Sequence, residues 1–267
     1  MATPKAEINK ILAEKRAGIK TGTRAMLDIL KDLQRQVIDE LGRATLESFD
    51  YHRLKQMIPT IEFQIRNFQE KADLEAAGLL EKYWGLGQNL VDSGLGASGI
   101  QVGFALSTSA LDAMKEFTVS KIKGLSSEAM TRIEAELHLG VLGQKTPQEV
   151  AQAIGMNLKD PSIFKNIATR AEVITETEMG RVFSQAAQNR MQEAAGQVEG
   201  LMKEWRHVGH PKVPRPAHLA ADGQRVPVDQ PFMVGGIPMM FPRDPKAPID
   251  QIINCGCDHV PYHSRWD

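Results

Sequence analysis

The uneven distribution of proline is the feature that most constrains how this chain can fold. Ten of the fourteen prolines in its 267 residues fall between positions 205 and 263. Proline lacks an amide hydrogen and clashes with the preceding helical turn, so no long helix can run through that stretch. The same stretch contains both cysteines and five of the seven histidines. The sequence therefore predicts a long helical body followed by a compact, turn-rich C-terminal module.

Two segments of the body carry apolar residues at spacings of three and four, which places one apolar face on a helix. The first segment comprises Met26, Ile29, Leu30, Leu33, Val37 and Leu41, and the second comprises Leu54, Met57, Ile58, Ile61, Ile65 and Phe68. A fainter stripe precedes them in residues 8–19, where Gly18 and Gly22 are expected to interrupt it. Pro59 is expected to start or kink the second helix. Both faces predict packing in a core or bundle, and a partner-binding helix is the alternative.

Further along the body, three helix starts are marked by local signals. Ser126 or Ser127 is suited to cap a helix that ends near Gly140. The sequence Thr146-Pro147-Gln148-Glu149 is a capping box with proline at the first helical position, and it predicts a helix over 147–154. Asp160-Pro161 introduces the longest helical pattern, which continues to about Gly196 with Gly180 as a weak point.

Six glycines lie between positions 85 and 103, and they predict a hinge or a connection between helices. Residues 94–99 match the pattern G-x-G-x-x-G. A dinucleotide site would require a β-strand before this pattern, whereas the preceding residues 73–91 have a helical pattern. We therefore interpret the match as a coincidence.

The C-terminal stretch has the turn signals of a small β-rich module. Asp222-Gly223 and Gly235-Gly236 are hairpin signals with short apolar segments beside them. Residues 251–254 are expected to form a third strand that leads into the cysteines. The predicted fold is thus mainly α, with a long helical body and a small C-terminal β-rich (α+β) module. The predicted regions are 1–124 (N-terminal helices), 125–204 (further helices) and 205–267 (the module).

The composition of the chain restricts the classes of partner that it can bind and the compartment in which it folds. Lys and Arg number 32 and Asp and Glu number 33, so the net charge of −1 excludes a strongly basic nucleic-acid coat. Residues 93–111 carry no charge, but their glycines, serines and threonines argue against insertion, and we expect no membrane association. The charged N-terminal residues 1–42 do not resemble a signal peptide. Two cysteines two positions apart are poorly placed for a disulfide, which indicates a reducing compartment.

The cysteines and histidines of the module are candidate metal ligands. In an extended segment Cys255 and Cys257 would present both thiolates on one side. Zinc prefers tetrahedral Cys and His ligands, and His218, His259 and His263 are the candidates to complete the set, with His207 and His210 behind them. The C-x-C spacing is tighter than that of most structural zinc sites. The alternative is that both thiols are buried packing residues and the histidines are surface groups.

Motifs of known enzymes are absent, and we assign no catalytic residue. His218 is not followed by the H-x-E pattern of zinc deaminases, and His138 is not part of H-E-x-x-H. The sequence contains no P-loop and no G-x-S-x-G. A metal-dependent nuclease or toxin-like enzyme that uses His207, His210, His218 and Asp222 is kept as an alternative on residue type alone.

The order of residues in the module resembles the C-terminal region of phage Mu F-like head morphogenesis proteins. The resemblance is carried by Trp205, Arg215-Pro216-Ala217-His218, Asp222-Gly223-Gln224, Val226, Pro231-Phe232, Pro242, Asp244-Pro245 and Ile253-Asn254-Cys255-x-Cys257. The helical segment 170–178 also resembles the family, and together the likeness covers about residues 125–260. The chain departs from the family pattern at Glu176 and Gly256, where arginine is usual, and it lacks an aspartate expected shortly after the tryptophan.

The resemblance implies a minor capsid protein of a tailed phage that acts in head morphogenesis at the portal vertex. It implies the portal protein as partner, a virion location after assembly in the host cytoplasm, and no catalytic activity. Further candidate partners are the major capsid protein, double-stranded DNA during packaging or ejection, and other copies of the chain in the particle. An internal virion protein without portal contact is the third alternative.

Overall fold

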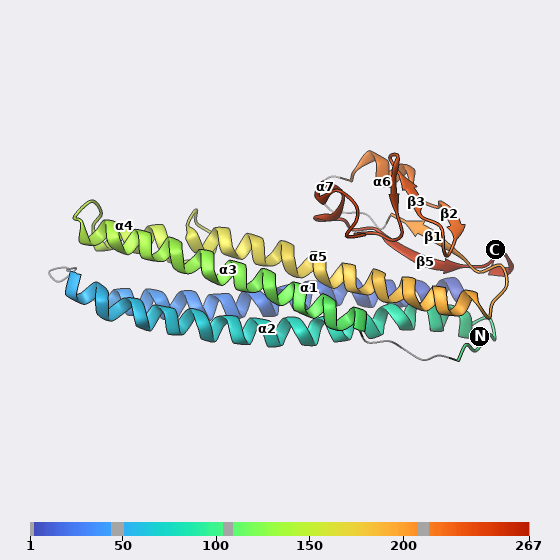
Figure 1. The fold of residues 1–267 in the computed structure, drawn as a ribbon, viewed down its shortest axis with the longest axis horizontal. Coiled ribbons are helices and arrows are strands. Elements are labelled where there is room, and N and C mark those ends of the chain that lie inside the picture. Colours follow the sequence, from blue (N-terminus) through green and yellow to red (C-terminus); the bar gives the residue numbers. More distant parts are fainter. Residues whose placement is uncertain (1–2, 44–50, 104–108, 208–213, 267) are drawn as a thin grey trace. The chain divides into compact units, whose positions relative to one another are not determined.

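The structure is a computed structural model that describes residues 3–43, 51–103, 109–207 and 214–266. It confirms a mainly α fold with a small C-terminal β module (Figure 1). The helical body consists of α1 (Pro4–Gly42), α2 (Tyr51–Gly96), α3 (Ser109–Val141), α4 (Pro147–Ile154) and α5 (Ile163–Ala195). The C-terminal part contains β1 (Met202–Arg206), α6 (Pro216–Ala220), β2 (Arg225–Pro227), β3 (Phe232–Val234), β4 (Ile237–Met239), α7 (Ile249–Ile252), β5 (Asp258–Tyr262) and the short 3-10 helix η1 (Ser264–Trp266).

The chain divides into two compact units that do not follow the sequence order. One unit comprises residues 1–21, 78–114 and 176–267, and we call it the terminal unit. The other comprises residues 22–77 and 115–175, and we call it the middle unit. Helices α1, α2, α3 and α5 each contribute residues to both. The structure thus groups the chain differently from the three consecutive regions expected from the sequence, because each long helix continues from one unit into the other.

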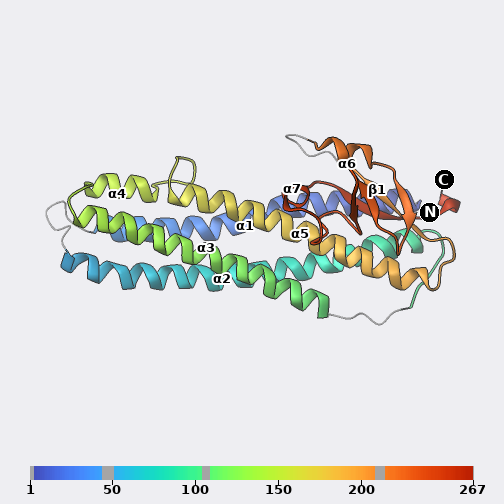
Figure 2. The ribbon, with the colours of Figure 1, turned by 45° about the horizontal axis from the view of Figure 1, so that its top comes forward.

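The middle unit is built on the two apolar stripes that the sequence shows. Met26, Leu30, Leu33, Val37 and Leu41 of α1 are buried against Leu54, Met57, Ile61, Ile65 and Phe68 of α2, together with residues of α3, α4 and α5. These helical segments run side by side in both views (Figures 1 and 2). Helix α4 begins as predicted, with Thr146 and Glu149 forming both hydrogen bonds of the capping box. The bundle interpretation of the stripes is therefore confirmed.

In the terminal unit, the first turns of α1 pack with the last part of α2 and most of α5. The core comprises Ile8, Ile11, Leu12, Leu80, Tyr83, Trp84, Leu90, Val91, Val182, Phe183, Ala186, Ala187 and Met191, with Val228 and Val260 from the C-terminal module. Buried Arg190 links these segments, since its Nε donates to Asp92 (2.6 Å) and its Nη2 donates to the Val102 carbonyl (3.0 Å).

The module contains a three-stranded antiparallel sheet in the order β2–β1–β5 and a separate β3–β4 hairpin. In the sheet, Met202 pairs with Tyr262, Trp205 with His259 and Arg206 with Asp258. The predicted turn at Gly235-Gly236 connects β3 and β4, and both glycines have positive φ (59° and 82°). The hairpin predicted there is confirmed.

Several predicted breaks in the helices are wrong. Helix α1 continues through Gly18 and Gly22, α2 contains Pro59 instead of starting there, and α3 begins at Ser109 rather than at Ser126. Of the glycine-rich residues 85–103, those up to Gly96 belong to α2, whereas the rest lie in a connection between α2 and α3, as the sequence predicts. A glycine costs a helix only about 1 kcal/mol relative to alanine, which the burial of a long apolar face can offset. Gly87 has a packing role, because a Cβ atom there would lie 2.3 Å from the carbonyl oxygen of Phe183.

The strand predicted over residues 251–254 is also wrong. Residues Ile249–Ile252 form the short helix α7, and Asn254 adopts a left-handed conformation with φ of 55°. The adjacent strand is β5, which follows the cysteines instead of preceding them. Apolar character at Ile252 and Ile253 suits a buried helical turn as well as a strand, so the local pattern could not decide between them.

Among the residues that the structure describes, no helix is both long enough and apolar enough to cross a membrane.

Candidate metal centre

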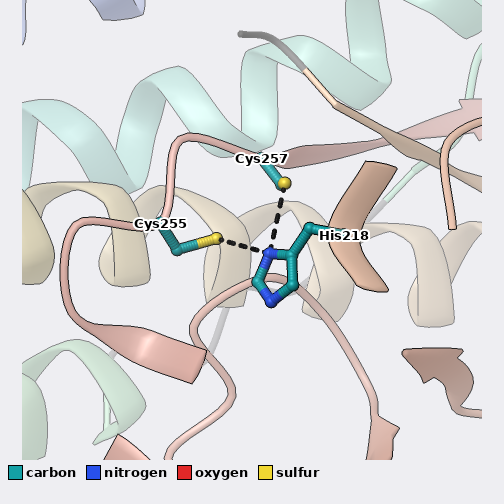
Figure 3. A group of neighbouring side chains, drawn as sticks. All are labelled: His218, Cys255 and Cys257. Carbon is teal, nitrogen blue, oxygen red and sulfur yellow. Dashed lines mark hydrogen bonds between the residues drawn. The ribbon is translucent and has the colours of Figure 1, made fainter. Parts of the chain in front are cut away.

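Three of the predicted ligands come together in the module. The Nδ1 atom of His218 lies 3.5 Å from Sγ of Cys255 and 3.5 Å from Sγ of Cys257 (Figure 3). All three residues are buried, and their donor atoms lie within 4.8 Å of one another. The nitrogen points between the two sulfurs, as the close-up shows. The fold therefore brings together a compact set of soft donor atoms, although His218 lies 37 and 39 positions from the two cysteines in the sequence.

Local structure explains how the three side chains reach one place. Helix α6 holds His218, and Pro216 occupies its first turn, where a missing amide hydrogen costs nothing. The two cysteines lie in the turn between α7 and β5, and the left-handed Asn254 reverses the chain immediately before them. Asparagine is among the few residues that adopt this conformation readily. Arg215 ties the two segments together by donating from Nη2 to the Ile253 carbonyl (2.7 Å).

The second ring nitrogen of His218 is held by an amide. Its Nε2 lies 3.0 Å from Oε1 of Gln251 on α7. Because that oxygen can only accept, Nε2 carries the hydrogen and donates it. In the neutral ring, Nδ1 then has a free lone pair directed at the thiols. Metal-binding histidines commonly donate their other N–H in this way, which fixes the tautomer and the ring orientation.

Arg243 holds the cysteine-containing turn by its main chain. Its Nη1 donates to the carbonyl of Cys257 (3.1 Å), and its Nη2 donates to the carbonyl of Cys255. The same side chain contacts α5, where Nη1 lies 3.4 Å from the Gly180 carbonyl. Arg243 is buried and has a positive φ of 68°. Its cation also favours the thiolate form of both cysteines.

The two thiols differ in acidity because they share one hydrogen bond. The hydrogen bond that its sulfur accepts from the Cys257 thiol holds the pKa of the Cys255 thiol well below its usual range. The same interaction with Cys255, together with burial, raises the pKa of the Cys257 thiol. The first proton therefore leaves easily and the second does not, unless a cation between the sulfurs stabilises both thiolates.

A fourth residue, His207, reaches the cluster from the end of β1. Its Nδ1 lies 3.5 Å from Sγ of Cys257. The sheet register explains the contact: Trp205 pairs with His259 and Arg206 with Asp258, so the next step in the same register places His207 opposite Cys257. Its amide donates to Oδ1 of Asp222 (2.7 Å), which fixes the main chain at this point. From the sequence His207 is only a reserve candidate, since no local pattern there predicts strand β1.

The structure places the other two predicted ligands elsewhere. His259 is fully buried on β5, where its ring lies 6.2 Å from that of Phe241 and 6.3 Å from that of Phe232, and neither of its nitrogens has a hydrogen-bond partner among the described residues. Burial and nearby cations hold its pKa well below the usual range. His263 Nε2 donates to the Glu199 carbonyl (3.1 Å), and its Nδ1 accepts from the Arg265 amide (3.1 Å). His210 lies outside the described residues.

The arrangement is suited to binding a metal ion rather than to nucleophilic catalysis. Sulfur and imidazole nitrogen are the ligands that zinc prefers. Reactive cysteines are usually partly exposed, whereas Cys255 and Cys257 are 5% and 1% exposed. Aromatic rings complete the surroundings, with Trp205 edge-on to His218 (5.7 Å) and to Phe232 (5.3 Å).

Comparison with known proteins gives one partial likeness. A segment of 109 residues, 40% of this chain, is 37% identical to the uncharacterized protein YqbB of Bacillus subtilis (strain 168). That segment covers 34% of YqbB, so the match spans about a third of the relative's length. No protein-family model matches the chain. No solved structure gives a significant match.

Proposed function

We propose that this protein is a minor head protein of a tailed phage, which binds the portal and acts in head morphogenesis. One observation carries the proposal: the residues on which the resemblance to Mu F-like proteins rests are the ones that build the module. Trp205, Phe232, Cys255 and Cys257 belong to one buried cluster although they are spread over more than fifty positions. Their shared place in one core supports the proposal, because residues of the resemblance act together in one folded unit.

The placement of the candidate nuclease residues supports a structural role over an enzymatic one. His218 directs one nitrogen at the thiols and the other at Gln251. The Asp222 carboxylate accepts the amide hydrogen of His207. A general base needs a free lone pair within reach of a substrate proton, and His218 is 2% exposed.

The structure also changes how the proposal should be tested. From the sequence alone, the natural test of partner binding is to delete residues 1–70. The C-terminal part would then be expected to stay folded. However, residues 1–21 belong to the same compact unit as residues 176–267. Lys15 of α1 forms a buried ion pair with Asp258 of β5. Such a deletion would remove part of the core around the module, so loss of function would not identify a portal-binding segment.

Point substitutions on the surface of the middle unit avoid this difficulty. Phe63 and Leu74 of α2 are 57% and 76% exposed, and serine at either position should leave the fold intact. The full chain is co-expressed with an affinity-tagged portal protein from its own phage. The purified complex is analysed by mass spectrometry. We expect stoichiometric co-purification, and assembled particles should contain the protein.

Three results separate the alternatives. Presence in particles without binding to the tagged portal would favour an internal virion protein. Reproducible cutting of plasmid DNA by the purified chain with magnesium, manganese or zinc, lost in His218→Ala, would favour the nuclease. Absence from both the portal complex and the particles would overturn the proposal. If Phe63→Ser or Leu74→Ser weakens co-purification while the melting temperature is unchanged, α2 forms part of the portal-binding surface.

A further inference from the structure

We propose that Cys255, Cys257, His218 and His207 bind one zinc ion in a closed tetrahedral site whose role is structural. This inference does not depend on the proposed function, because it concerns how the module is held together. The donor set is two thiolates and two imidazoles. A tetrahedral set of this kind selects zinc over the harder cations that prefer oxygen ligands.

The distances agree with such a site. In a tetrahedral complex with Zn–S near 2.3 Å and Zn–N near 2.0–2.1 Å, sulfur and nitrogen lie about 3.5 Å apart. Three sulfur–nitrogen pairs have this separation: Cys255 with His218, Cys257 with His218, and Cys257 with His207, each at 3.5 Å. In each pair the histidine atom is Nδ1, so both rings present the same nitrogen.

The fourth ligand follows from the strand pairing. His207 is half-buried at the end of β1, opposite Cys257 in the β1–β5 register. Among the described residues, the donor atoms that all lie within 4.8 Å of one another are those of His218, Cys255 and Cys257, so His207 has to turn its side chain toward Cys255 and His218 to join them. His259 cannot serve in the same way, since its ring is enclosed between Phe232 and Phe241. The ligands are thus supplied by the end of a strand, a short helix and the C-x-C turn.

The residues around the cluster match the needs of a bound metal. Gln251 orients His218 through its second nitrogen, and Arg243 fixes both cysteine carbonyls. Two thiolates balance the charge of Zn²⁺, so the loaded site is neutral and can be buried at low cost.

A structural metal would meet a need of this fold. The strands of the module are three to five residues long, and sheets this small bury little apolar area. Zinc would connect segments that lie 37 to 50 positions apart in the sequence. Metal binding of this kind is coupled to folding, since the unfolded chain has no preformed site.

The test uses the full chain purified under reducing conditions. We expect one zinc per chain by plasma mass spectrometry, and cobalt exchange should give a thiolate-to-cobalt charge-transfer band with the intense visible bands of tetrahedral cobalt. Cys255→Ser and Cys257→Ser should lose the metal. Gln251→Ala should retain it with affinity lower by about 10- to 100-fold. His263→Ala is the matched control and should bind zinc as the wild type does.

His207→Ala decides the identity of the fourth ligand. Its side chain is at the edge of the cluster, so the variant should fold even where the cysteine variants do not. We expect a zinc affinity at least about tenfold below that of His263→Ala, in line with the losses seen when a metal site is disturbed, together with a changed cobalt spectrum. Equal affinity in these two variants would overturn the role of His207. Native protein without stoichiometric zinc that also takes up neither zinc nor cobalt would overturn the site as a whole.

Discussion

Gly180 of α5 and the guanidinium of Arg243 are so close that a Cβ atom at position 180 would lie 2.5 Å from Cζ of the arginine. A long arginine side chain can usually move aside, but this one is buried and bonded to the carbonyls of Cys255 and Cys257. Gly180, which weakens the helical pattern of α5, thus leaves the space that the Arg243 side chain occupies. Arg243 in turn holds the turn that contains both cysteines.

Gly180→Ala should therefore destabilise the protein although alanine favours helix. Overpacking typically costs about 1–3 kcal/mol, and the gain in helix propensity returns at most about 1 kcal/mol. We expect a net loss of about 1–2 kcal/mol in the free energy of unfolding and faster proteolysis of the module. Urea denaturation measures the first quantity and limited proteolysis the second. Gly124→Ala on α3, where a Cβ meets nothing within 4 Å, is the control. A stabilised Gly180→Ala variant would show that the Arg243 side chain moves aside at little cost in free energy.

Gly85 and Gly87, two positions apart on α2, should respond with opposite sign to the same change. A Cβ at Gly85 meets nothing within 4 Å, whereas at Gly87 it would lie 2.3 Å from the Phe183 carbonyl oxygen and 2.9 Å from Cβ of Ala186. We expect Gly85→Ala to stabilise by about 0.5–1 kcal/mol. Gly87→Ala should destabilise by about 1–3 kcal/mol, because a backbone atom cannot turn away. Thermal melts of the two variants test this pair, and a rise in both melting temperatures would contradict the close approach of α2 and α5.

Long amphipathic helices and local caps could be predicted from the sequence, while helix boundaries marked by glycine could not. The faces at Met26–Leu41 and Leu54–Phe68 repeat over many turns, and every additional turn strengthens the signal. A glycine lowers the local helix propensity by only about 1 kcal/mol relative to alanine. Whether a helix ends there therefore depends on packing against residues that are distant in the sequence. Gly87 shows the result, since its partner is the α5 backbone nearly a hundred residues later.

The candidate site was partly predictable for a related reason. Two cysteines at C-x-C spacing and a nearby group of histidines indicate metal chemistry by residue type. Which histidines join them depends on the register of β1 against β5, and a one-residue shift would turn each side chain to the other face. Strand β1 pairs with a strand more than fifty residues later, so no hairpin turn between the two fixes this register. The sequence therefore included His218 but favoured His259 and His263 over His207.

Removing one partner of the ion pair between Lys15 and Asp258 should be among the most destabilising single substitutions in the terminal unit. Both side chains are 2% exposed, and Lys15 Nζ also lies 4.4 Å from the centre of the Phe183 ring. Removing one partner of a buried pair leaves an uncompensated charge, which typically costs about 3–5 kcal/mol. We expect a loss of this size for Lys15→Met, measured as the change in the free energy of unfolding.

The control for Lys15→Met is on the same helix. Lys10 is 75% exposed and pairs with Glu7 at 3.9 Å, so Lys10→Met should change stability by less than about 1 kcal/mol. The double variant Lys15→Met, Asp258→Leu should recover part of the loss, because apolar residues of similar size can replace a buried pair. If Lys15→Met proves as mild as Lys10→Met, α1 does not depend on this contact with β5.

Lys203 should make the stability of the terminal unit depend on pH in the alkaline range. Its Nζ donates to Oε1 of Gln188 (3.1 Å) and to the Met240 carbonyl (2.8 Å). Burial lowers the pKa of Lys203 from 10.5 to about 8, although the charges of Asp229 and Asp244 act in the opposite direction. Between these two values the unfolded chain binds the proton more tightly than the folded chain does. The contribution of Lys203 to stability should therefore rise with pH across this window and stay constant below it.

Comparison with Lys203→Met isolates this effect from the other groups that titrate above pH 8, including Lys15, whose pKa burial likewise lowers to about 8. Urea denaturation of both proteins is measured at half-unit steps from pH 7 to pH 10. We expect the free energy of unfolding of the wild type, minus that of Lys203→Met, to be flat up to about pH 8 and to increase beyond it, since only the wild type loses a proton from residue 203 on folding. A difference that falls with pH would mean that the protonated amine is the favoured form in the fold, with Asp229 and Asp244 outweighing burial.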